Sequence, residues 1–423
     1  MPVRSLRGTE PFHWDGTQGD PYGGIDAKSG FARKKPTCRS EDATSCIKHL
    51  LGLNLSTTMV SDVKHSPPAL TLTPDQLEFL AIYNLAVPYP PAPERPFNNE
   101  LSIRAKKGFE LFHVEGDKNP KSHILNLPSP NVCGNCHRMP FLTSTNTPGQ
   151  GMDAPTWRGA YDRHLLLPQG RMNIIDFPWI KEIANGGRDE FKMWRLSWSG
   201  DQGPRTAFDP VWSMVLEGST GFSGAFARQV TLDKKTARSQ NSLNLWSELE
   251  LAAKQGMVVL ECEGVFIAKD EGRRARLQFI PGDLADAYFE KASDNAAYSK
   301  DELLRLAKEG RFVGTLIARH GAKSDFFTNP QPALWTLGPL PFQGKQIFPT
   351  VDPYSKTIAF SGAYFFEDAL IFVDGKATTG TISRKKGNDV VLTLNTMPSK
   401  GMHLLQVQVP QGQMSNDFIF YVK

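Results

Sequence analysis

The most chemically distinctive residues of the chain are two cysteines and a histidine in the run Cys133-Gly-Asn-Cys136-His137. Two thiols three positions apart lie on one helical turn, so both can add to the vinyl groups of a haem, and the adjacent histidine then falls on the iron. Zinc sites and redox pairs also use Cys-x-x-Cys. Zinc needs two further ligands at suitable spacing, and none is apparent, while a redox pair is expected in a βαβ unit. The motif therefore predicts one covalent haem c with His137 as proximal ligand.

The sixth ligand of the predicted iron is left open among several methionines. A thioether ligand raises the reduction potential of haem iron, which suits electron transfer. Met172 and Met193 are candidate metal ligands, and the sequence separates them neither from each other nor from ordinary core residues. Met214 is expected in the core of a terminal helix, and His164 is expected at the surface or hydrogen-bonded.

Helices are expected on both sides of the motif. Thr73, followed by proline and aspartate, begins one of them, and the proline-rich residues 87–96 after it predict a stiff extended spacer. A second helix is expected from near Asn99, with Gly108 allowing another helix to cross closely. Residues 155 to about 230 are rich in tryptophan and are expected to be helical with long loops.

Three segments around the motif carry a resemblance. They are Ala-Lys-Lys-Gly-Phe-Glu-Leu-Phe at 105–112, Ala-Pro-Thr-Trp-Arg-Gly at 154–159 and His-Leu-Leu-Leu-Pro-Gln-Gly-Arg at 164–171. Together with the haem motif they resemble the c-type cytochrome domain of the di-haem cytochrome c peroxidase and MauG-like superfamily, over residues 99–230. The resemblance implies that Pro155 and Arg158 belong to the cofactor-binding residues, with the Pro155 carbonyl accepting a hydrogen bond from His137.

One departure from that family concerns its distal histidine, which falls at Pro168 here. A peroxidase needs an acid–base group to split the O–O bond, so the loss counts against peroxide chemistry at this haem. Residues 6–16 resemble the same family segment with its histidine, His13, in place. His13 and Met59 are therefore candidate pocket residues of a first haem, whose motif is expected upstream of this chain.

The other cysteines have separate expectations. Cys38 and Cys46 enclose seven residues of polar loop, a spacing that suits a disulfide in an oxidising compartment, although two unpaired thiols are the alternative. Cys262 lies in an alternating, strand-like stretch and is expected to be a buried small hydrophobe without a functional role.

The last part of the chain has the pattern of an all-β module. Apolar alternation punctuated by glycine, asparagine, proline or aspartate predicts six strands, at 357–361, 369–373, 379–384, 389–394, 402–409 and 417–421. These segments resemble an IPT/TIG domain of immunoglobulin-like fold, which implies a spacer or a contact surface. Residues 240–330 mix helical and strand-like stretches and predict a small α+β or β-rich unit.

The predicted fold class is multidomain: mostly α cytochrome c-like domains, a small mixed middle unit and a C-terminal β-sandwich. We expect a partial cytochrome c-like domain without its haem motif at 1–95 and the domain with the motif at 96–235. The mixed unit follows at 236–330 and the IPT/TIG-like sandwich at 331–423.

The sequence favours a haem c-binding electron-transfer protein of the bacterial cell envelope. The alternative is a di-haem peroxidase or MauG-like oxidoreductase whose first haem motif lies upstream, and a third possibility is a surface interaction protein in which haem is secondary. The net charge of +4, without a basic stripe, gives no indication of nucleic acid, and no apolar run is long enough to span a bilayer. The expected partner is a redox protein or a small electron donor or acceptor. The expected location is the periplasm or the cell surface, with the signal peptide missing from a truncated start.

Overall fold

The computed structural model describes residues 72–116, 156–162, 204–269, 271–282, 286–291, 296–321, 328–337 and 348–423, together with positions 6, 48, 134, 137, 139, 140, 143, 144, 153, 154 and 323. β-Sheet dominates this part of the chain. It contains sheets of six, five, four and two strands, and five α-helices. The mostly α, cytochrome c-like fold class is therefore wrong for the described residues. The prediction rested on the resemblance of residues 99–230 to a helical domain. After residue 228, however, apolar residues alternate with a period of two, so most of the described chain there forms strands.

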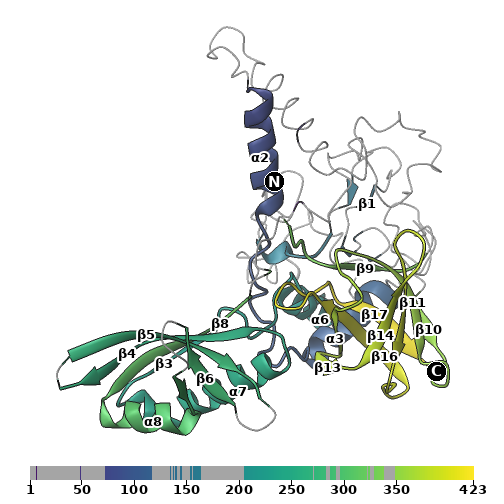
Figure 1. Cartoon of the computed structure of the whole chain (residues 1–423). Helices are drawn as coiled ribbons and strands as arrows, with labels where there is room; N and C mark the ends of the chain where they lie inside the picture. Colours follow the sequence, from purple (N-terminus) through teal and green to yellow (C-terminus); the bar gives the residue numbers. More distant parts are fainter. Residues whose placement is uncertain are drawn as a thin grey trace, which may run out of the picture.

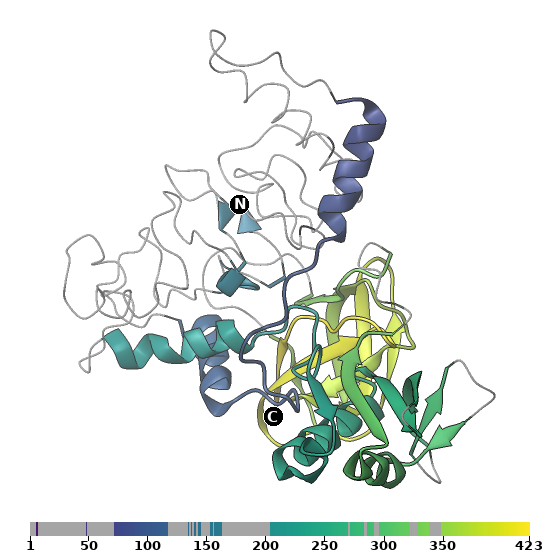
Figure 2. The same cartoon turned by 90° about the vertical axis from the view of Figure 1, so that its left-hand side faces the viewer.

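The first described helix, α2 (Pro74–Ala86), has the expected N-terminus. The Thr73 hydroxyl accepts a hydrogen bond from the Gln76 amide, and the Gln76 side chain accepts one from the Thr73 amide, which completes a capping box. The helix ends where Val87, which precedes a proline, adopts an extended conformation. In both views α2 rises away from the sheets (Figure 1, Figure 2).

Two helices that are far apart in sequence cross closely. They are α3 (Ile103–Glu110), which continues as a π-helical turn η3 (Leu111–Glu115), and α6 (Pro204–Glu217). A Cβ atom on Gly108 would overlap the backbone carbonyl of Pro210 and lie 2.8 Å from the Cβ of Met214. The close crossing expected at Gly108 is thus confirmed. Ser102, which caps α3, also donates hydrogen bonds from its amide and hydroxyl to the Glu217 carboxylate, at 2.8 and 2.6 Å.

The middle of the chain forms an antiparallel six-stranded sheet in the order β3–β8–β4–β5–β6–β7. Its strands are β3 (Gln229–Leu232), β4 (Val259–Ala268), β5 (Glu271–Ile280), β6 (Ala287–Glu290), β7 (Ala297–Tyr298) and β8 (Phe312–Arg319). Helices α7 (Gln240–Lys254) and α8 (Lys300–Glu309), with the 3₁₀ turn η9 (Thr236–Arg238), contribute buried residues to one core with the sheet. Trp246, Leu260 and Leu316 lie in that core with no exposed surface.

The C-terminal part is built from two facing sheets. The five-stranded sheet contains β10 (Thr350–Val351), β17 (Phe418–Val422), β16 (Gly401–Gln408), β12 (Leu370–Val373) and β13 (Lys376–Thr378), in that order. The four-stranded sheet contains β14 (Gly380–Arg384), β15 (Asp389–Leu394), β11 (Thr357–Ala363) and β9 (Ala333–Trp335). One apolar cluster fills the space between the sheets, where the rings of Phe360 and Phe418 lie 5.6 Å apart.

The five-stranded sheet is also covered on its outer face. Leu404 and Ile419, which are directly opposite in register, belong to the same buried cluster as Phe109 and Met214 of the crossing helices. Farther along the face, Phe372 belongs to the core of the six-stranded sheet. In Figure 1, α3 and α6 accordingly lie beside β16 and β17. Both faces of this sheet are therefore buried, one against the four-stranded sheet and the other against the helices and the core of the six-stranded sheet.

The proline-rich segment is packed into the molecule, with Tyr89, Ala92 and Arg95 buried. The Arg95 guanidinium donates hydrogen bonds to the Glu217 carbonyl at 2.8 Å and to the Gln406 side chain at 2.7 Å. It also pairs with the Asp417 carboxylate at 3.2 Å, and both side chains are at most 2% exposed. One buried cation thus links the segment after α2, the end of α6 and the five-stranded sheet.

Candidate cofactor site

Of the predicted site residues, the structure describes His137 and Arg158. His137 is half-buried and Gly134 of the same motif is buried. The remaining candidates lie outside the described residues; these are Cys133, Cys136, Pro155, Met172 and Met193, and also His13, Cys38, Cys46, Met59, His164 and Pro168. What can be built from the structure is therefore the surroundings of His137.

The imidazole of His137 lies against the end of the first crossing helix. Its ring centroid is 6.4 Å from that of Phe112, which belongs to η3 and is 8% exposed. Phe109, one turn earlier, is fully buried against α6. Because residues three and four apart share a helix face, the pair forms one apolar wall, which borders His137 through Phe112.

Trp157 completes this wall from a segment distant in sequence. Its indole meets Phe109 edge-on at 5.4 Å and Phe112 at 6.4 Å, and it is 5% exposed. The chain turns directly after it, because Gly159 has a φ of +68° and a side chain there would overlap the Tyr89 ring. The 3₁₀ turn η5 (Ala160–Asp162) follows. Aromatic surface from η3 and from residues 156–162 thus converges on one place.

His113 is the polar member of this aromatic cluster, and sequence reasoning missed it. The indole N–H of Trp157 donates to Nε2 of His113 at 3.0 Å, so the other ring nitrogen, Nδ1, carries the proton and donates to the Phe109 carbonyl at 3.1 Å. Burial lowers the pKa of His113 to about 4, so the ring is neutral at pH 7. Its position four residues after Phe109, on the apolar face of an expected helix, was the available signal.

Arg158 is buried beside the same segment. Its guanidinium lies 5.4 Å from the centre of the Tyr89 ring, within cation–π range, and the residue is 1% exposed. The next polar contacts belong to Tyr161, whose hydroxyl donates to the Pro90 carbonyl and lies 3.1 Å from the Thr220 hydroxyl. These contacts hold residues 156–162 against the proline-rich segment.

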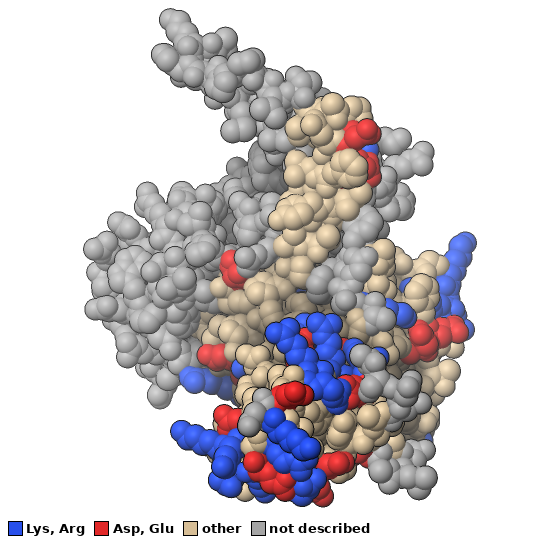
Figure 3. All heavy atoms as spheres, turned by 60° about the vertical axis from the view of Figure 1, so that its left-hand side comes forward, with Lys and Arg blue, Asp and Glu red and all other residues tan. Residues whose placement is uncertain are grey.

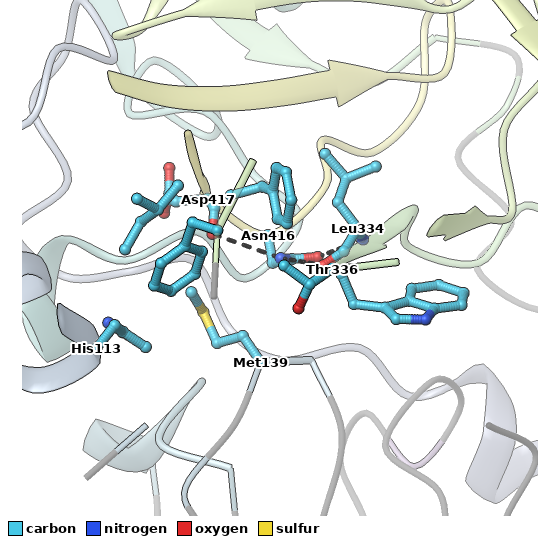
Figure 4. A pocket seen from close by; sticks show the side chains of 10 residues that line it. His113, Met139, Leu334, Thr336, Asn416 and Asp417 are labelled. Carbon is cyan, nitrogen blue, oxygen red and sulfur yellow. Dashed lines mark hydrogen bonds between the residues drawn. The ribbon is translucent and has the colours of Figure 1, made fainter. Parts of the chain in front are cut away.

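Met139, two residues after His137, lies in a small pocket at the edge of the five-stranded sheet. Phe348, Ile419 and His113 also line this pocket, which has about 20 Å³ of open space. That volume is enough for about one water molecule. The pocket is therefore a small gap between packed elements and is too small for a substrate. Figure 4 shows Met139 and His113 approaching it from the side opposite Asn416 and Leu334.

Other candidate chemistry is sparse in the described residues. No group of three or more histidine, cysteine, aspartate or glutamate side chains that could hold a metal ion occurs among them. Cys262 is a free thiol, 1% exposed, and burial raises its pKa to about 12. The expected burial of Cys262 in a strand is thereby confirmed. Among the helices that the structure describes, none is long and apolar enough to cross a membrane.

Figure 3 shows Lys and Arg side chains in clusters with Asp and Glu side chains beside them, so the charge on this face is mixed. Ion pairs among the described residues include Arg273 with Glu290 on the six-stranded sheet and Arg305 with Glu309 on α8.

The residues present fit a covalently attached haem by the chemistry of the donor set. Two thiols followed by an imidazole are the atoms that such an attachment uses. The described imidazole lies beside the buried ring of Phe112, and apolar surface of this kind suits a large apolar macrocycle. Cys133, Cys136 and His137 would hold the group.

No protein-family model and no curated protein matches the chain. Among solved structures, the Bacteroides ovatus mixed-linkage glucan utilization locus SGBP-B, in complex with a mixed-linkage heptasaccharide, is 11% identical over 39% of this chain and 38% of that one, with a TM-score of 0.17. The γ-CGTase from alkalophilic Bacillus clarkii is 12% identical over 53% of this chain and 32% of that one, also with a TM-score of 0.17. The chain thus spans well under half of either structure, and likeness at this level carries no conclusion about fold or function.

Proposed function

We propose that the chain binds one haem c through Cys133 and Cys136, with His137 as proximal ligand, and transfers electrons in the bacterial cell envelope. The observation that carries this proposal is the Cys-x-x-Cys-His motif, whose histidine lies beside a buried aromatic wall. When bound, the haem supplies one-electron redox chemistry.

The chain's own residues then bind the group and control its surroundings. His137 presents an imidazole nitrogen, and the Phe112 ring, which packs against Phe109 and Trp157, covers one side of it. A low-dielectric environment disfavours the more highly charged ferric state and raises the reduction potential. These roles suit an electron carrier, because binding and insulation are sufficient for electron transfer and no acid–base group is needed.

The central test is covalent haem retention. Expression with the cytochrome c maturation machinery should give a chain that stains for haem on a denaturing gel, and C133A/C136A should abolish the stain. The matched control is C262A, which removes the buried thiol outside the motif and should leave staining unchanged. A wild-type chain without covalent haem would overturn the proposal.

A second measurement addresses the sixth ligand. If methionine ligates the iron, the weak near-infrared sulfur-to-iron band is present and should disappear in M172A or in M193A, whichever replaces the true ligand. A wild-type ferric spectrum without this band would exclude methionine as a ligand.

A further inference from the structure

His113 is a buried polar side chain in an otherwise apolar cluster. It is 3% exposed, and its neighbours in the cluster are phenylalanine, tryptophan, methionine, leucine and isoleucine. Removing an imidazole from water is costly, and the cost is offset only when both ring nitrogens find partners. Both do, in the Phe109 carbonyl and the Trp157 indole. A leucine would fill similar space without that cost, so the histidine has a use beyond packing.

The hydrogen bonds of His113 connect the two segments that form the aromatic wall. Nδ1 of the His113 ring donates to the Phe109 carbonyl of α3, four residues earlier in the chain. Nε2 accepts the hydrogen bond of the Trp157 indole. The ring centroid of Phe112 lies 5.1 Å from that of His113 and 6.4 Å from those of Trp157 and His137. Fixing the indole therefore fixes the orientation of the aromatic wall, which borders the His137 imidazole through Phe112.

The position of His113 also joins this wall to the sheet. His113 lines the pocket that receives Met139, two residues after His137, and the opposite side of the pocket is formed by the C-terminal strands (Figure 4). His113, which holds Trp157, and Met139, just downstream of His137, therefore line the same pocket.

We propose that His113 is a positioning residue of the haem site: by holding Trp157 against Phe109 and Phe112, it keeps water from the proximal side and thereby sets the reduction potential. This inference rests on the proposed function. His113 does not touch the iron and transfers no proton. Its effect is to keep the local dielectric low, which is one of the means by which a protein tunes a haem.

Redox titration of the haem-loaded chain tests the inference. H113L removes both hydrogen bonds at similar volume, W157F removes the indole donor and keeps a ring, and H113Q keeps a side-chain acceptor for the indole. We expect all three to retain haem. The midpoint potential should move to more negative values in H113L and W157F, and H113Q should restore much of the wild-type value. The double variant H113L/W157F should shift no further than the larger single shift.

The control is H403Q, which removes a buried histidine of the C-terminal sheet that bonds to Asp374 and not to the aromatic wall. It should change the melting temperature and leave the midpoint potential unchanged. If wild type carries no covalent haem, the proposed function fails and this inference fails with it. If wild type carries haem but H113L and W157F have wild-type potentials, or more positive ones, the proposed function stands and His113 only supports packing.

Discussion

The surroundings of three buried histidines shift their pKa values in opposite directions. His113 and His320 are desolvated, and burial lowers the pKa of each to about 4. His320 lies between aromatic rings, 5.2 Å from Phe222 and 4.6 Å from Phe226. His403 instead bonds to the Asp374 carboxylate at 2.7 Å and to the Ser399 carbonyl at 2.6 Å, and the carboxylate raises its pKa. The first two histidines favour the neutral ring, and the third favours the cation.

The lowered pKa values predict a loss of stability in mild acid. Below about pH 6.5 the unfolded chain binds protons at His113 and His320, whereas the folded chain does so only near pH 4. The free energy of unfolding should therefore fall between these values, by up to about 3 kcal/mol for each histidine. Urea unfolding at pH 7.5 and pH 4.5 measures the loss, which should be smaller in H320F than in wild type. Equal losses in the two proteins would contradict the assignment.

His403 predicts the opposite trend at higher pH. Because its folded pKa lies above its unfolded value, its contribution to stability is complete below pH 6.5 and is lost as the pH rises through the folded pKa. Wild type should lose more unfolding free energy than H403Q between pH 6 and pH 9, as measured by chemical denaturation. A pH dependence identical in the two proteins would show that the pair with Asp374 does not stabilise the fold.

Helices and strands with a clear hydrophobic period or a capping signature could be predicted from the sequence. The tertiary contacts between them could not. The alternation at 389–394 gave the bounds of β15, and the Thr73 signature gave the start of α2. The fold class failed because a local helical resemblance says nothing about how much of the remaining chain forms sheets. The bond between His113 and Trp157 joins residues 44 positions apart, and sequence spacing gives no signal for such a pair. For the candidate cofactor site, the Cys-x-x-Cys-His motif predicts the two thiols and the imidazole that would hold the group. It gives no signal for the aromatic wall of Phe109, Phe112 and Trp157.

At the helix crossing, G108A should destabilise the protein strongly. The new methyl group would overlap the Pro210 carbonyl, which is backbone and cannot rotate away, so α3 must move from α6. We expect a loss of about 1–3 kcal/mol or more in unfolding free energy, measured by thermal or chemical denaturation. G272A is the matched control, since its Cβ would meet only a Val265 methyl group at 3.1 Å on an exposed hairpin. A G108A protein as stable as G272A would show that the crossing is loosely packed.

At the scale of the molecule, the buried pair between Arg95 and Asp417 links several of the described parts. Besides Arg95, the Asp417 carboxylate accepts a hydrogen bond from the Ser219 amide at 2.8 Å. D417N would leave Arg95 buried without its countercharge, which costs about 3–5 kcal/mol in comparable cases. The unfolding transition should shift accordingly, and limited proteolysis should cut more readily near residues 87–99.

An exposed ion pair provides the control for that experiment. R305A removes the pair with Glu309 on the surface of α8 and should change stability by less than about 0.5 kcal/mol. If D417N were no more disruptive than R305A, the buried pair would not hold the parts together.

The two-sided burial of the five-stranded sheet has a consequence for the order of synthesis. Helices α3 and α6 complete their apolar cluster with Leu404 and Ile419, which come much later in the sequence. Since a chain is made from its N-terminus, the two helices must wait until residue 419 has been made before this core can close. We therefore expect the helices and the C-terminal sheet to finish folding together.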